Sequence, residues 1–147
     1  MEQNIDEKDI LKELFVKEED VMERLKNLVK LSHGLFSIVE ETGEIFIEDP
    51  ADLNNSDKIF LFLLGSYFAF KYGIKSKGPH MSPSELANKL SVPITTIPAP
   101  MKKLLQEKTV LKSEKGIYQI NSDNYKKIKD ALIELRKKCG KYKEEKK

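Results

Sequence analysis

Apolar residues recur at helical spacing in the first part of the chain. Residues 6–16 carry a short apolar stripe, and residues 18–32 repeat apolar positions at intervals of three and four. This repeat marks one face of an amphipathic helix. The residues that form it are Val21, Leu25, Leu28 and Leu31. The pattern therefore predicts a helix over 18–32, preceded by a shorter helical segment.

The next residues change from helical spacing to two short runs rich in β-branched and aromatic side chains. The runs 35–39 and 44–48 flank a turn that contains Gly43. Such runs around a glycine turn are typical of a β-hairpin. The turn-forming residues 49–56 follow, and they predict a linker.

A nearly continuous apolar stretch from residue 59 to residue 70 predicts a helix over 57–72, with Ser56 as its N-cap. A helix that is apolar all round is expected to be buried on all sides. The segment 82–85 (Ser-Pro-Ser-Glu) then has the pattern of a capping box with proline at the first helical position. It predicts a second helix, which ends near Leu90.

A third helix is predicted after the Ser-Val-Pro turn at 91–93. Its inward positions are Ile97, Met101, Leu104 and Leu105. Pro98 and Pro100 fall near its start, and a proline inside a helix removes a backbone hydrogen bond. We therefore expect this helix to begin near Pro98.

The remaining pattern predicts a second hairpin and a last helix. Residues 109–112 and 117–120 flank a glycine-containing turn. Ser122 or Asn121 is the expected N-cap of the helix that follows. Its apolar face consists of Tyr125, Ile128, Leu132 and Leu135. This face either closes the core of one molecule or forms a dimer interface.

The order helix, helix, tight turn, helix, hairpin over residues 56–121 resembles the winged helix-turn-helix superfamily. The resemblance is carried by 82–93, 95–97, 101–104 and 110–120. It covers a little over half of the chain and extends to 138 if the last helix is included. It implies an α+β fold with three helices and a β-hairpin wing. The expected parts are an acidic helix–hairpin extension (1–55), a winged-helix domain with a C-terminal helix (56–138) and a disordered basic tail (139–147).

In that superfamily the second helix of the pair lies in the major groove of DNA. The resemblance therefore implies a DNA-binding protein, a transcriptional regulator, with contacts from this helix, from the wing and from the end of the preceding helix. The residues implied are Thr95, Thr96, Ala99, Lys102, Lys103, Gln106, Lys112, Lys115 and Lys89.

The charge distribution supports an anionic partner for the second half of the chain. Residues 1–57 hold 6 basic and 16 acidic side chains, a net of −10, whereas residues 58–147 hold 20 basic and 8 acidic, a net of +12. Such asymmetry is typical of chains in which one half binds nucleic acid. The acidic half is expected to bind a protein, to form a dimer surface or to cover the basic half. A degenerate second winged helix is a further reading of it.

The type of basic residue limits how well the basic half of the chain can recognise a particular DNA sequence. The chain has 24 lysines and two arginines, Arg24 and Arg136, neither of them in the predicted recognition helix. Bidentate arginine–guanine contacts are the commonest specific contacts, whereas lysine mainly contacts phosphate. We therefore expect modest sequence specificity. The alternative is a protein-interaction module that uses the same scaffold without binding DNA.

Other function classes find little support in the sequence. The chain lacks the common motifs of hydrolases, P-loop enzymes, dinucleotide-binding enzymes and metalloproteases, so no enzyme activity, cofactor or metal is expected. Cys139 lies among lysines, a setting that favours a lower pKa, but it sits in a fraying tail with no base nearby, so a reactive thiol is not expected. The polar, acidic start is not typical of a signal peptide, and no apolar run is long enough for a membrane span. We therefore expect a cytoplasmic protein, dimeric through its C-terminal helix or its N-terminal extension.

Overall fold

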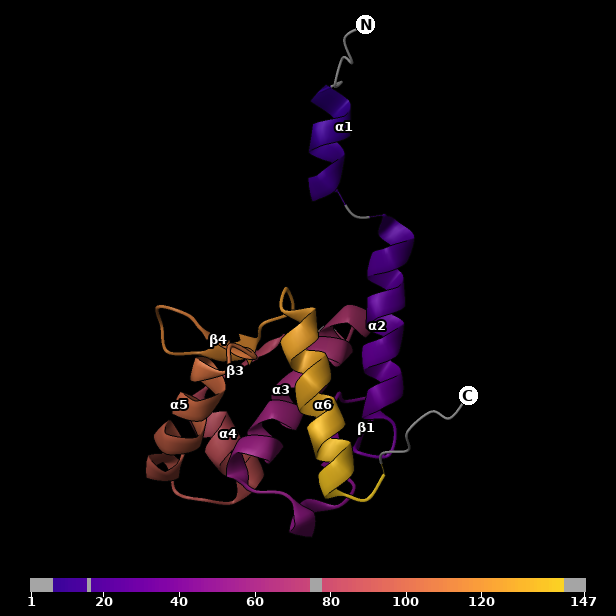
Figure 1. Cartoon of the computed structure of the whole chain (residues 1–147). Helices are drawn as coiled ribbons and strands as arrows, with labels where there is room; N and C mark the ends of the chain where they lie inside the picture. Colours follow the sequence, from indigo (N-terminus) through magenta and orange to yellow (C-terminus); the bar gives the residue numbers. More distant parts are fainter. Residues whose placement is uncertain (1–6, 16, 75–77, 142–147) are drawn as a thin grey trace, which may run out of the picture.

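The computed structural model describes residues 7–15, 17–74 and 78–141, and over these the chain has an α+β fold (Figure 1). The α-helices are α1 (Glu7–Leu11), α2 (Glu18–Ser32), α3 (Asn55–Tyr72), α4 (Pro83–Leu90), α5 (Pro98–Gln106) and α6 (Tyr125–Lys138). The strands are β1 (Phe36–Ile38), β2 (Ile45–Ile47), β3 (His80–Met81), β4 (Val110–Lys112) and β5 (Tyr118–Ile120). Short 3₁₀ turns occupy Lys12–Leu14, Pro50–Asp52 and Ile94–Thr96.

Helix α3 is the centre of the core, as its apolar sequence predicts. Its buried residues run without interruption from Ile59 to Ser66, and α4, α5, β5 and both strands of the first hairpin pack around it. The predicted cap is wrong by two residues. Asn54, and not Ser56, is the N-cap, because its side chain accepts from the N–H of Asp57 (2.9 Å) while the Asp57 carboxylate accepts from the N–H of Asn54 (3.2 Å). Ser56 is buried inside the first turn.

The strands form two small antiparallel sheets. β1 and β2 form the first predicted hairpin, with Phe36 opposite Ile47. β4 and β5 form the second, and β3 adds to β5, so that the strand order is β3-β5-β4. Val110, Tyr118 and Met81 are buried on the face toward the core. The sequence pattern does not predict β3, since two residues are too few for an alternation to be recognised.

The acidic N-terminal part shares its core with the rest of the chain. Leu28 of α2, Phe36 of β1 and Ile45 of β2 belong to the same hydrophobic cluster as α3, α5 and α6. Helix α2 packs along α6, and the first hairpin packs on α3. Residues 17–54 therefore cover α3 and α6, and Figure 1 shows α2 on the opposite side of α6 from α5.

Helix α6 begins at Tyr125, later than the cap predicted at Ser122 or Asn121. The residue before it, Asn124, gives no side-chain cap. Its amide donates instead to the carbonyl of Lys108, which also accepts from Asn121, at 3.0 Å in each case. Lys108 has a positive φ of 64°, a conformation that costs an L-residue about 1–2 kcal/mol. The two asparagines therefore hold the strained turn between α5 and β4.

The guanidinium of Arg136 joins the ends of α6 and α2. It donates to the carbonyls of Leu31 (3.0 Å) and His33 (2.6 Å) at the end of α2, and to that of Lys141 (3.1 Å). Lys141 in turn bonds the carbonyl of Gly34 and pairs with Asp49 at 2.6 Å. Residues 139–141, which the sequence assigns to the disordered tail, are thus held against the body. Residues 142–147 lie outside the described residues.

We expect Arg136→Ala to lower the free energy of unfolding by about 2–3 kcal/mol, because it leaves carbonyls at a helix end without their charged donor. Arg24→Ala is the matched control, since the exposed Arg24 lies over the ring of Tyr125 at 5.5 Å and such a contact contributes about 0.5–1 kcal/mol. Urea denaturation followed by circular dichroism measures both. Equal losses in the two variants would contradict this role of Arg136.

No helix in the described part of the chain combines the length and the apolar character that crossing a bilayer requires.

Candidate nucleic-acid interface

Helix α4 has the local structure that its sequence predicts. The N–H of Glu85 donates to the Ser82 hydroxyl (3.1 Å), and the Glu85 carboxylate accepts from the N–H of Ser82 (2.9 Å). Pro83 occupies the first helical turn, where its missing N–H costs nothing. The helix ends at Ser91 in a left-handed conformation with φ of 58°, which turns the chain toward α5. The two helices are therefore joined by a short, sharply turned connection.

Helix α5 begins at Pro98, as expected from the two prolines. Pro98 and Pro100 both fall in the first turn, where backbone N–H groups have no partner within the helix. Thr95 and Thr96 lie in the 3₁₀ turn before the helix. The start of α5 consequently offers few amide donors for a phosphate, since two residues of its first turn lack an N–H.

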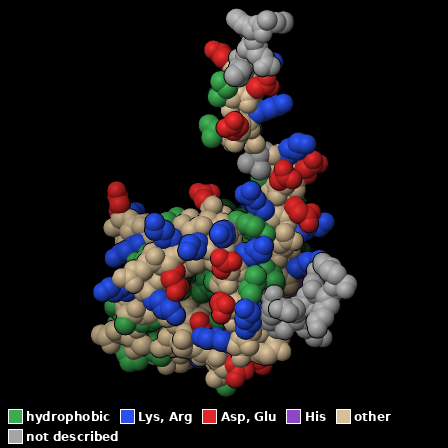
Figure 2. Space-filling model, viewed as in Figure 1, with side chains coloured by type: hydrophobic (Ala, Val, Ile, Leu, Met, Phe, Trp, Pro, Cys, Tyr) green, Lys and Arg blue, Asp and Glu red, His purple; other side chains and the backbone are tan. Residues whose placement is uncertain are grey.

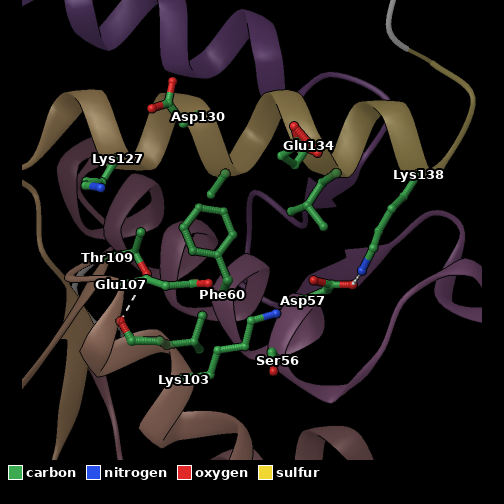
Figure 3. A pocket seen from close by; sticks show the side chains of 13 residues that line it. Ser56, Asp57, Phe60, Lys103, Glu107, Thr109, Lys127, Asp130, Glu134 and Lys138 are labelled. Carbon is green, nitrogen blue, oxygen red and sulfur yellow. Dashed lines mark hydrogen bonds and ion pairs between the residues drawn. The ribbon is translucent and has the colours of Figure 1, made fainter.

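The side chains of α5 divide between the core and two exposed flanks. Met101 and Leu104 are buried, whereas Lys102 and Gln106 are exposed on the side away from the core. Lys103 is exposed on the other flank, where it lines a groove of about 430 Å³ between α3, α5 and α6. Figure 3 shows its side chain pointing toward Asp57 and Ser56 of α3. The side chains of Lys102 and Lys103 therefore point to different sides of α5.

The β4–β5 hairpin places two lysines beside α5. Its turn is closed by the hydroxyl of Ser113, which accepts from the N–H groups of Lys115 and Ile117 at 3.3 Å. Gly116 follows with φ of 77°, a conformation that suits glycine. Lys115 is exposed in this turn, and Lys112 is exposed with its ammonium 5.9 Å from the ring centroid of Tyr118.

The solvent face of the three-stranded sheet carries a row that the sequence pattern did not reveal. His80, Gln119 and Leu111 are paired across the strands, and on the other face Met81, Val110, Tyr118 and Ile120 are buried. Leu111 is 44% exposed, and Ile94 before α5 is 51% exposed. Alternation along β4 could have identified Leu111 as outward, but His80 becomes visible only once β3 pairs with β5.

Lys89 has a different environment from the other candidate lysines. Its ammonium lies 3.7 Å from the carboxylate of Glu44, next to β2. The N-terminal hairpin thereby contacts the end of α4. This ion pair competes with any contact that Lys89 makes to an external anion.

The exposed lysines of α5 and of the hairpin remain accessible. Figure 2 shows Lys and Arg side chains spread over α5, the β4–β5 hairpin and α6, interrupted by single acidic side chains. The N-terminal elements lie on α3 and α6. Neither arginine is on α5 or the hairpin, because Arg136 joins α6 to α2 and Arg24 lies over Tyr125. The accessible cations here are lysines.

The thiol of Cys139, near the C-terminus, lies among carboxylates as well as lysines. Burial and then the carboxylates of Asp49 and Asp52 raise the pKa of Cys139, although Lys141 opposes them. The pKa of Cys139 is thus raised in spite of the lysines beside it in the sequence, because these carboxylates come from a distant part of the chain. Within the described residues, Asp49, Asp52 and Cys139 hold potential metal-ligand atoms within 4.8 Å of one another. The ammonium of Lys141 already supplies a cation to Asp49 at 2.6 Å.

Comparisons of the chain with protein-family models, with curated proteins and with solved structures found no match.

Proposed function

We propose that residues 55–138 form a winged helix-turn-helix domain and that the protein is a cytoplasmic transcriptional regulator that binds duplex DNA. The order α3, α4, α5 and β4–β5, with β3 added to the hairpin, supports the assignment of the fold. The observation that carries the function is the accessible set of lysines on two adjacent elements, α5 and the β4–β5 hairpin, which the acidic N-terminal half does not cover.

In this proposal α5 enters the major groove and the hairpin lies along the backbone. Thr95, Thr96 and Gln106 approach the base edges, and Lys102, Lys112 and Lys115 contact phosphates. Lys103 contacts a phosphate on the α6 side of the helix. Lys89 contributes least, since it is paired with Glu44. Lysine is a point charge without the planar fork of arginine. We therefore expect the protein to bind DNA with little preference among sequences.

Fluorescence anisotropy with a labelled random-sequence duplex over a salt series tests the proposal. We expect binding at low salt, with the logarithm of the association constant falling by roughly 3–4 per tenfold increase in salt, which corresponds to about four released counterions. A protein that does not bind duplex DNA even at the lowest salt would contradict the proposed function.

A second function, binding a protein partner through the same face, is favoured by one observation. Ile94, in the 3₁₀ turn before α5, is 51% exposed and Leu111 of β4 is 44% exposed, and we infer that they belong to one apolar patch of the kind that marks protein contacts. A pull-down from native extract with wild-type protein and with an Ile94→Glu, Leu111→Glu variant separates the two. One stoichiometric protein, lost in the variant, without DNA affinity would support this second function.

A further inference from the structure

Residues 7–15, named here the arm, expose an apolar face that the rest of the molecule does not cover. The arm comprises α1, the 3₁₀ turn Lys12–Leu14 and Phe15, and no residue in it is buried. Its four large apolar side chains have exposed fractions of at least one half: Ile10 57%, Leu11 50%, Leu14 80% and Phe15 73%. Figure 2 shows hydrophobic side chains on a projection that stands clear of the body.

Extended backbone lies on either side of residue 16, between the arm and α2. Phe15 and Lys17 both have extended conformations, with ψ of 137° and 146°. Figure 1 shows α1 beyond the first turn of α2, on the side away from the body. Isolated helices shorter than about 12–15 residues are marginal in water. The helical arm therefore requires a packing partner for its apolar face. The body of its own molecule does not supply one, because the arm extends away from it.

The same molecule has an apolar groove with the properties that such a helix requires. The groove measures about 520 Å³ and lies between α2, β1 and the end of α3. Its apolar lining consists of Leu25, Val29, Ile38, Phe68, Ala69, Tyr72 and Ile74. Leu25 and Lys71 also line a second depression of about 280 Å³ along α2. The two depressions therefore adjoin at these two side chains.

We propose that the arm of one molecule docks in this groove of a second copy, and that the exchange is reciprocal, giving a two-fold dimer. The partner is a second copy because one chain carries both complementary surfaces while its own arm points away. Charge does not oppose this choice. The acidic side chains of the arm (Glu7, Asp9, Glu13) are nearly balanced by Lys8 and Lys12, and the groove is lined by one acidic and one basic side chain, Glu40 and Lys71.

Reciprocity also supplies the area that a stable dimer needs. An aromatic side chain presents about 150–250 Å² and an aliphatic one less, so each arm offers roughly 400 Å² at its observed exposure. Two arms and the two surfaces that they cover then bury at most about 1,600 Å², the size of a standard interface of about 1,200–2,000 Å². A single arm would bury only half of this. Exchange of identical segments closes the assembly at two copies. The proposed dimer does not depend on the proposed DNA binding.

Sedimentation equilibrium of the full chain from micromolar to millimolar concentration tests the proposal with three variants. The arm variant is Leu14→Glu, Phe15→Glu, and the groove variant is Val29→Glu. The control is Phe46→Glu, because Phe46 is 59% exposed but lies outside the arm and the groove. Circular dichroism verifies folding, which the substitutions should leave intact since none of these side chains is buried.

We expect the wild type and the control to form dimers, and the arm and groove variants each to raise the dimer dissociation constant at least about tenfold. An equimolar mixture of the two variants is expected to form a heterodimer, because one intact arm meets one intact groove. A monomeric wild type at every concentration, which docking of the arm onto its own α2 would produce, overturns the proposal. So does a dimer that either variant leaves unchanged.

Discussion

Reversing the charge at Lys102, Lys112 and Lys115 is expected to lower the affinity for duplex DNA at least about 100-fold at moderate salt. These lysines are exposed on α5 and the hairpin, and in the proposed complex each of them lies beside a phosphate. Each Lys→Glu change removes one attraction and adds one repulsion. The dependence of affinity on salt should weaken as well, since about three fewer counterions are released on binding. Anisotropy titrations across a salt series measure both quantities.

A second triple variant with the same change in net charge serves as the control. It shows whether the loss of DNA affinity comes from contacts at the proposed face or from the lower net charge of the protein. Lys26, Lys30 and Lys126 are exposed on α2 and α6, and their conversion to glutamate lowers the net charge equally. We expect this control to lose no more than about tenfold in affinity, because its charges act only over long range and are screened. Equal losses in the two triple variants would place DNA binding elsewhere on the molecule or make it nonspecific.

The second large effect is expected at Gly65, inside the buried helix α3. A Cβ at this position would lie 2.8 Å from Cγ1 and 2.9 Å from Cδ1 of Ile45 in β2. Glycine normally weakens a helix by about 1 kcal/mol relative to alanine, so its presence here reflects the close approach of the hairpin. We expect Gly65→Val to lower the free energy of unfolding by about 3 kcal/mol through overpacking. Denaturant unfolding measures the loss.

Shortening the opposing side chain should recover part of that loss. Ile45→Ala alone is expected to cost about 2–4 kcal/mol because it opens a cavity. In the double variant the valine occupies the vacated space, so the combined cost should fall below the sum of the single costs by about 1–3 kcal/mol. Additive costs would show that Ile45 does not press on α3. The result therefore tests whether the acidic N-terminal hairpin and α3 share one core.

The features that the sequence predicts well are those determined by neighbouring residues. The capping box of Ser82 and Glu85 is formed by groups within one helical turn. The start of α5 at Pro98 is likewise determined by residues within one turn. The α+β class and the two hairpins likewise follow from local alternation and glycine turns. Assignment of these elements to a winged helix rests on resemblance and stays a proposal.

The features that the sequence could not supply depend on distant partners. Asn124 does not cap α6 with its side chain, because its amide is taken by the carbonyl of Lys108. The carboxylates that raise the pKa of Cys139 lie some ninety residues before it. The division of Lys102 from Lys103, and the pairing of Lys89 with Glu44, appear only when α3, α6 and the hairpin are packed. The resemblance to the winged-helix superfamily implied DNA contact for all three of these lysines without distinguishing their environments.

Mapping of amide chemical shifts in isotope-labelled protein during titration with a short duplex tests the central claim most directly. The account predicts that the largest shifts cluster at residues 94–106 and at the hairpin 110–120, while α2 and the arm shift little. It also predicts that added salt reverses them. Shifts centred on α2, on the arm or on the groove beside them, or no shifts at low salt, would contradict the claim that α5 and the β4–β5 hairpin form a DNA-binding face.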